Sequence, residues 1–119
     1  MNIKEFDEKY YFHDSLIDKI SYDENKRELT FVFDFCFWAQ QGYKKEEKEN
    51  GMLKVVFNGV ESYDGPVGND MSNWWSVLDG DIKDGKYHFF IEDVRKDVID
   101  SEYFDIYINA ENVEVEDLR

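Results

Sequence analysis

The residues with the clearest potential for chemistry lie near the start of the chain, in Phe12-His13-Asp14-Ser15. Histidine, aspartate and serine are the side chains of a hydrolytic triad, in which a carboxylate orients an imidazole that activates a hydroxyl. A triad needs the three groups to converge, whereas successive strand residues point to opposite faces. The spacing therefore favours a structural role, in which Asp14 and Ser15 bond nearby backbone groups and His13 packs beside them. The alternative is a site in which Asp14 orients the imidazole of His13.

Cys36, the single cysteine, is a second candidate for chemistry. A thiolate beside a basic group is a nucleophile, so activation requires His13 or His88 to approach Cys36. Nothing in the spacing demands that approach, and a free cysteine between strand aromatics is typically a small buried hydrophobe. A small enzyme or ligand-binding site that uses His13, Asp14, Cys36 and His88 remains an alternative, and it needs a cleft that joins them.

The stretch from Asp79 to Gly85 has the carboxylates of a calcium loop without their spacing. Counted from Asp79, the fifth, sixth and twelfth positions hold Lys83, Asp84 and Phe90. An EF-hand has an oxygen ligand, a glycine and a glutamate at those positions. Two Asp-Gly turns, at 79–80 and 84–85, explain the residues better. The sequence therefore predicts no metal site, and no motif in it indicates a cofactor.

The pair Trp74-Trp75 lies in a purely acidic window, because the chain has no lysine or arginine between Lys54 and Lys83. Adjacent residues of a strand or helix point different ways, so we expect one indole in the core and the other near the surface. An exposed indole among carboxylates suits a basic protein surface, since aromatic side chains anchor interfaces and an acidic field speeds encounter. The candidate partner-binding residues are Trp74, Trp75, Glu61, Asp64, Asp70, Asp79 and Asp81. The alternative is a solvated acidic loop over ordinary core tryptophans.

Charge and composition restrict the class of protein. Of 119 residues, 28 are acidic and 14 are basic, which gives a net charge of −14, and 18% are aromatic. Duplex nucleic acid and anionic membranes are poor partners because their field repels the chain, and the aromatic content argues against disorder. The length predicts a single domain over residues 1–119. The opening residues lack an apolar signal segment and the cysteine has no bridging partner, so we expect a cytoplasmic protein.

Strand-forming residues dominate, since valine, isoleucine and aromatic side chains far outnumber alanine, leucine, methionine and glutamine. Over residues 28–38, strict alternation places on one face of a strand Leu29, Phe31, Phe33, Phe35 and Phe37. Further strands are predicted over 15–23, 52–60, 86–93, 102–110 and 113–115, with a loop at 42–51. Helices are predicted from the N-terminus to about residue 11 and, capped by Asp70 or Ser72, over 73–78. The predicted fold is α+β, a predominantly antiparallel β-sheet of about five to seven strands with one or two short helices.

Several short segments resemble small uncharacterised bacterial proteins that share an "HDS" opening and a strand ending in a Phe-x-Gly-Val element. These segments are residues 12–17, with His13-Asp14-Ser15, 29–33, 56–60, with Phe57-Asn58-Gly59-Val60, and 110–115. The resemblance implies an α+β or mainly antiparallel fold of unknown function. Some proteins of similar size and acidity are immunity proteins that neutralise a toxin in their own cell. The resemblance carries over no catalytic residues.

The function that these residues favour is non-catalytic binding of a basic protein, of a toxin-neutralising or regulatory kind. Binding would use Trp74 or Trp75 within the acidic surface. Two alternatives from other classes stay open: the small enzyme or ligand-binding protein described above, and a structural or oligomerising subunit. The sequence makes no prediction of the oligomeric state.

Overall fold

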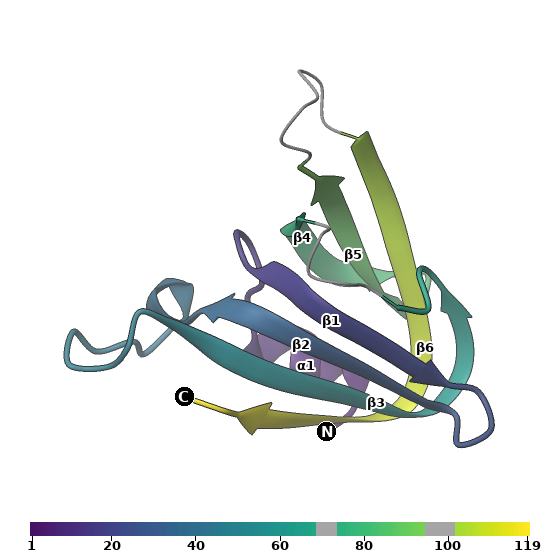
Figure 1. The fold of residues 1–119 in the computed structure, drawn as a ribbon. Coiled ribbons are helices and arrows are strands. Elements are labelled where there is room, and N and C mark those ends of the chain that lie inside the picture. Colours follow the sequence, from purple (N-terminus) through teal and green to yellow (C-terminus); the bar gives the residue numbers. More distant parts are fainter. Residues whose placement is uncertain (69–73, 95–101) are drawn as a thin grey trace.

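The strands form one antiparallel sheet that closes on itself (Figure 1). The computed structural model describes residues 1–68, 74–94 and 102–119. Over these ranges the elements are α1 (Ile3–Lys9), β1 (Leu16–Asp23), β2 (Glu28–Cys36), the 3-10 turn η1 (Phe37–Ala39), β3 (Asn50–Asp64), β4 (Trp75–Lys83), β5 (Lys86–Asp93) and β6 (Glu102–Asp117). The strand order around the barrel is β1-β2-β3-β6-β5-β4, with antiparallel neighbours throughout. The prediction of an α+β fold dominated by antiparallel sheet is confirmed.

The two ends of the sheet meet along a short seam between β1 and β4. Residues 16–17 of β1 pair there with residues 75–76 of β4. Just before β1, the backbone N–H of Asp14 donates to the carbonyl oxygen of Val77 at 2.9 Å, and the N–H of Val77 donates to the carbonyl oxygen of Ser15 at 2.8 Å. The barrel is therefore closed by a handful of backbone contacts, whereas β3 and β6 are paired along most of β3.

The barrel interior is filled by the residues that the alternation pattern selects. In β2 the buried face consists of Leu29, Phe31, Phe33 and Phe35. The predicted strand over 28–38 ends earlier than expected, at Cys36, because the chain turns into η1. Phe37 extends the buried row from η1, while Trp38 is 48% exposed. Burial of this aromatic row removes a large apolar area from water, which is the main driving force for folding.

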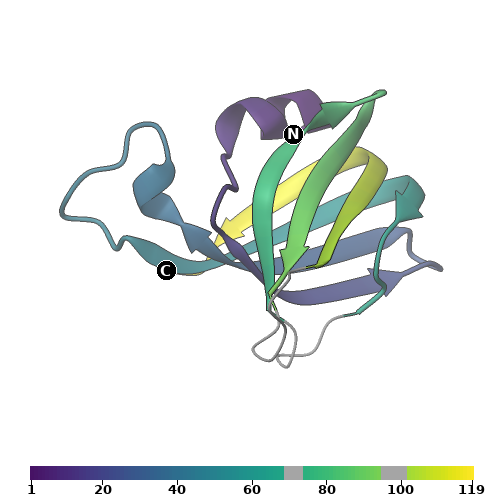
Figure 2. The same cartoon turned by 90° about the horizontal axis from the view of Figure 1, so that it is seen from above.

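The N-terminal helix α1 covers part of the barrel through one buried side chain. Its N-terminus has a capping box: the side-chain oxygen of Asn2 accepts a hydrogen bond from the backbone N–H of Glu5, and the side-chain carboxylate of Glu5 accepts one from the backbone N–H of Asn2. Phe6 is fully buried, and its ring packs edge-on against Tyr87 with centroids 4.9 Å apart. Figure 2 shows α1 beside β4 and β5, which it contacts along with β6.

The predicted helical turn over residues 73–78 is wrong, because residues 75–83 form strand β4. Trp75 and Val77 are buried and the residues between and around them are more exposed, which is the period of a strand. Pairing with β5 therefore outweighs the local capping signal. The proposed caps Asp70 and Ser72 lie outside the described residues. Two other strands are longer than expected: β3 runs through a bulge to Asp64, and β6 joins the two segments predicted at 102–110 and 113–115.

Only one of the two predicted Asp-Gly turns is a turn. Asp84 and Gly85 have φ of 52° and 76° and link β4 to β5. Asp79 and Gly80 instead lie inside β4, next to a register shift. Gly80 is required there by space, since a Cβ atom on it would lie 2.5 Å from Oη of Tyr87. The second prediction failed because a glycine that makes room for a core ring has the same sequence signature as a turn glycine.

Candidate functional site

The two adjacent tryptophans point to opposite sides of the barrel wall. Trp75 is 9% exposed and packs edge-on against Phe104, with ring centroids 5.2 Å apart. Trp74, immediately before β4, is 50% exposed. Its carbonyl oxygen accepts from the N–H of Val94 at 2.8 Å, so the backbone of Trp74 continues the pairing of β4 with β5. The expectation of one core indole and one surface indole is confirmed, and Trp74 is the exposed one.

Trp74 adjoins the outward side of β4, β5 and β6. On these strands the outward residues alternate with fully buried ones such as Phe89, Ile91 and Ile106. The strand register aligns them in rows: Tyr107 pairs with both Asp64 and His88, and His88 pairs with Asp81. We call this surface the outer acidic face, and it consists of Asp64, Trp74, Asp79, Asp81, His88, Phe90, Glu92, Tyr103, Asp105 and Tyr107.

Aromatic rings on the outer acidic face stack in pairs. Phe90 and Tyr103 have centroids 5.7 Å apart and planes 16° from parallel, and Tyr103 is 55% exposed. Offset stacking of this kind holds an exposed ring in place, so that it loses little freedom when it is covered. With Trp74, these rings provide apolar area on a surface that also carries the carboxylates of Asp64, Asp79, Asp81, Glu92 and Asp105.

His88 is bound by a carboxylate on each side. Its Nδ1 lies 2.8 Å from Oδ1 of Asp81 on β4, and its Nε2 lies 2.7 Å from Oδ1 of Asp105 on β6. The imidazole also stacks on Tyr107, with centroids 4.8 Å apart, which leaves His88 only 4% exposed. Both ring nitrogens are therefore occupied, and neither can serve His13 or Cys36.

The acidic candidates have different outcomes. The structure places Asp64, Asp79 and Asp81 on the outer acidic face. Glu61 lies beside it, at the bulge in β3, and accepts from the side chain of Asn109 at 3.2 Å. Asp70 lies outside the described residues. The sequence argument missed Asp105, and with it Phe90, Glu92, Tyr103 and Tyr107, because cross-strand register is needed to bring them beside the acidic window. Their alternation with buried strand residues was the available signal.

The His13-Asp14-Ser15 stretch belongs to the seam of the barrel. Nδ1 of His13 lies 2.6 Å from the carbonyl oxygen of Leu78, so this nitrogen donates. The half-exposed Asp14 side chain is 3.4 Å from Nε2 of the same ring. The Ser15 hydroxyl accepts from the backbone N–H of Cys36 at 3.1 Å. These contacts tie β1, β2 and β4 together, and the three residues are not arranged as a triad.

Cys36 has the surroundings of an inert thiol. It is 5% exposed, and Nδ2 of Asn50 donates to its sulfur at 3.5 Å. Burial raises the pKa of the Cys36 thiol, and the carboxylates of Asp14 and Asp34 raise it further against the effect of the hydrogen bonds from Ser15 and Asn50. A raised pKa keeps the sulfur protonated and weakly nucleophilic.

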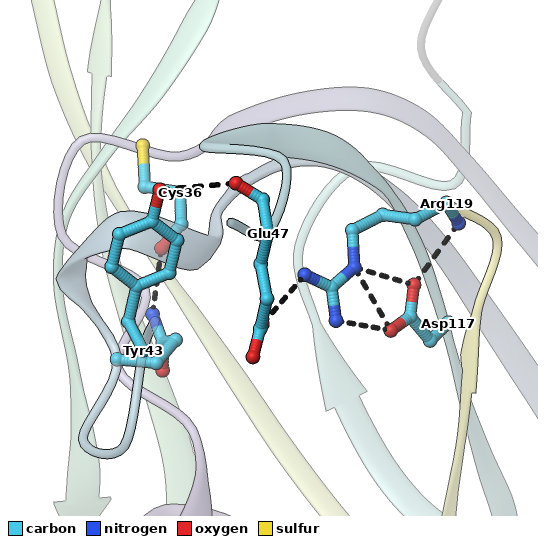
Figure 3. A network of polar contacts seen from close by, with 6 residues as sticks. Cys36, Tyr43, Glu47, Asp117 and Arg119 are labelled. Atoms are coloured by element: carbon cyan, nitrogen blue, oxygen red, sulfur yellow. Dashed lines mark hydrogen bonds and ion pairs between the residues drawn. The ribbon is translucent and has the colours of Figure 1, made fainter. Parts of the chain in front are cut away.

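A groove of about 320 Å³ lies elsewhere, between the end of α1, the loop after η1 and the end of β6. Arg119 is its most connected side chain: the guanidinium stands 3.6 Å from the centroid of the Phe37 ring and binds the carboxylates of Asp117 and Glu47 (Figure 3). These bonds hold the pKa of Asp117 below its ordinary value. The candidate residues His13, Cys36 and His88 do not line this groove.

The structure also bears on metals and membranes. Within residues 1–68, 74–94 and 102–119, no three histidine, cysteine, aspartate or glutamate side chains are grouped as metal ligands. No helix in the part of the chain that the structure describes has the length and apolar character needed to cross a membrane.

Comparisons with known proteins add no relative. No protein-family model matches the chain, and neither the curated proteins nor the solved structures contain a match. The resemblance of the His13-Asp14-Ser15 and Phe57-Asn58-Gly59-Val60 segments to the HDS-motif proteins therefore stays a prediction.

Proposed function

We propose that this protein is a non-catalytic, cytoplasmic binding module that holds a basic protein against its outer acidic face. The observation that carries the proposal is the placement of Trp74: a half-exposed indole at the rim of a rigid sheet face that also presents Asp79, Asp81, Glu92 and Asp105. A toxin-neutralising role is the specific form that the HDS-motif resemblance suggests, and a regulatory role is the other.

Physical chemistry supports this use of the face. Indole and phenol side chains are enriched among the residues that dominate binding energy, and the stacked pair Phe90 and Tyr103 lies on the same side. Carboxylates around such anchors repel acidic proteins and accelerate the approach of basic ones. The basic residues of β4 and β5, Lys83 and Lys86, lie at the turn between the strands, away from Trp74. Among the described residues of the outer acidic face, none near Trp74 is a lysine or arginine, and this end of the face is suited to contact with a basic partner.

A catalytic function receives less support from the geometry. His88 is held by Asp81 and Asp105, Cys36 is a buried thiol with a raised pKa, and His13 is bonded to the backbone of β4. These candidates face three different surroundings, and catalysis needs its groups within hydrogen-bond reach of one another or of a shared substrate.

The test is a pull-down from the native cell lysate at low and at high salt, with the partner then purified and its affinity measured. We expect a basic protein whose complex weakens as salt rises. Trp74→Ala should weaken that complex at least about tenfold, the range of an interface anchor. Trp38→Ala is the matched control, because Trp38 is 48% exposed on a different element. A complex that is insensitive both to salt and to Trp74→Ala would remove the proposal.

Carboxylate substitutions separate a local effect from an effect of net charge. Asp79→Asn combined with Glu92→Gln removes two charges from the outer acidic face. Glu8→Gln combined with Glu24→Gln removes the same charge from exposed positions on α1 and on the turn after β1. Binding through the outer acidic face predicts that the first pair slows association more than the second.

A further inference from the structure

The groove beside η1 contains a complete set of contacts for one guanidinium group. The Arg119 guanidinium lies over the face of Phe37, 3.6 Å from the ring centroid, in cation–π geometry. Nε donates to both oxygens of Asp117, at 3.2 Å to Oδ1 and 3.0 Å to Oδ2, and Nη2 donates to Oδ2 at 2.8 Å. Nη1 donates to Glu47 at 3.2 Å. A planar fork that meets a carboxylate in two places and an aromatic face is the arrangement that distinguishes arginine from lysine.

The floor of the groove is shaped for the aliphatic part of the same side chain. A Cβ atom on Gly51 would lie 2.6 Å from Cγ of Arg119 and 3.4 Å from Cε2 of Phe37. The missing side chain at Gly51 therefore provides the space through which the arginine stem reaches the ring. Figure 3 shows Glu47 turned from its loop toward the guanidinium, and its carbonyl oxygen accepts from Oη of Tyr43 at 3.1 Å. We call Phe37, Glu47, Gly51 and Asp117 the arginine socket.

The charge of the groove depends on Arg119. With Arg119 in place, the carboxylates of Glu47 and Asp117 are balanced by Arg119 and Lys9. Without Arg119, two carboxylates remain against Lys9 alone, and Lys9 lies over a different ring, 5.8 Å from the centroid of Tyr10. The vacated socket would carry excess negative charge next to an aromatic face, which favours another cation of the same shape.

We propose that the arginine socket binds an arginine side chain presented by a partner protein, and that Arg119 is an internal occupant that competes with it. Apart from one bond from the backbone N–H of Arg119 to Oδ1 of Asp117, the socket contacts the guanidinium and its stem, both of which any exposed arginine supplies. The partner is a protein for this reason, and because the chain as a whole is strongly acidic. The socket is separate from the outer acidic face, so the two proposals stand or fall independently.

The probe is the peptide acetyl-Gly-Gly-Arg-Gly-Gly-amide, titrated into isotope-labelled protein while NMR follows the backbone amide of Gly51. The matched peptide has citrulline, which keeps the shape of arginine and lacks its charge. An internal competitor lowers the apparent affinity to the intrinsic affinity multiplied by the fraction of time that the socket is open. If Arg119 occupies the socket nine-tenths of the time, Arg119→Ala should tighten binding of the arginine peptide about tenfold.

Four further variants make the outcome decisive. Lys26→Ala changes the net charge equally at an exposed turn and should give no such gain. Arg119→Gln keeps the stem and should reproduce the gain, which separates competition from loss of packing. Glu47→Gln in the Arg119→Ala background should lose most of it, whereas Glu24→Gln in that background should not. The proposal is overturned if the citrulline peptide binds equally well, if neither Arg119 variant gains affinity, or if Lys26→Ala gains as much.

Discussion

Nε2 of His88 lies 2.7 Å from Oδ1 of Asp105 across the β5–β6 pair, on the outward side of the barrel. With Asp81 on the other nitrogen, the imidazole spans three strands. Each of the two carboxylates therefore contacts one nitrogen of the same ring. This Asp81–His88–Asp105 bridge holds the three strands together at the centre of the outer acidic face, and it occupies both ring nitrogens of His88.

Replacing His88 with alanine should therefore destabilise the protein. The change removes a buried ring and its bonds to the carboxylates of Asp81 and Asp105, and we expect the free energy of unfolding to fall by about 1–3 kcal/mol. Urea unfolding followed by circular dichroism measures it. His13→Ala is the control, since that half-exposed ring has one backbone bond, and it should cost about 1 kcal/mol or less. Equal losses for the two variants would contradict the bridge.

The two tryptophans should differ in their contribution to stability. Trp75 is buried against Phe104, so Trp75→Ala should lower the free energy of unfolding by about 3–5 kcal/mol. Trp74→Ala removes a half-exposed ring and should change it by about 0.5 kcal/mol. Thermal or urea unfolding of both variants makes the comparison. A large loss for Trp74→Ala would mean that Trp74 is part of the core and is unsuited to be an anchor.

Gly80 and Tyr87 should show coupled effects. Gly80→Ala places a methyl group 2.5 Å from Oη of Tyr87 and should destabilise the protein by about 1–3 kcal/mol. Within the described residues this buried hydroxyl has no hydrogen-bond partner, so Tyr87→Phe should be neutral or stabilising. The double variant should recover much of the loss. Additive effects in a double-mutant cycle would show that the hydroxyl does not cause the clash.

Cys36 should react slowly while the protein is folded. Because burial raises its thiol pKa above the ordinary value, the thiolate fraction at pH 8 is smaller than in the unfolded chain, and its reactivity rises only at higher pH. We expect iodoacetamide to label the folded protein roughly tenfold or more slowly than the urea-unfolded chain. Mass spectrometry over time measures both rates. Rapid labelling of the folded protein would revive the nucleophile hypothesis.

Period-two alternation was sufficient to predict the main strands and their buried faces. The strand assignment from Leu29 to Phe35 is unambiguous because each buried apolar residue is separated from the next by one outward-facing residue. Local signals failed where long-range pairing decided the outcome. The capping residues before Trp74 suggested a helical turn, yet pairing with β5 makes the following segment a strand. At Gly80, the spatial neighbour Tyr87 decides the conformation, and sequence spacing does not reveal that contact.

In the candidate site, too, local sequence features could be predicted and contacts that depend on strand pairing could not. The acidic window and the exposed indole were visible in the composition between Lys54 and Lys83. Asp105 was not, because its place beside His88 depends on the register of β5 against β6. The arginine socket was also beyond prediction, since Phe37 and Arg119 lie far apart in the sequence and meet only once the barrel has formed.

The contacts of Asp14 and Ser15 with Val77 have a consequence for how the protein opens. Local unfolding of the barrel should begin between β1 and β4, because few hydrogen bonds join these two strands and local opening starts at the weakest set of contacts. Separation of β1 from β4 would expose the aromatic side chains of the barrel interior. It would also turn β1 and β4 into unpaired edge strands, each able to pair with a strand from another molecule. By holding β1 against β4, the backbone bonds of Asp14 and Ser15 in the "HDS" triplet would then oppose self-association of the protein.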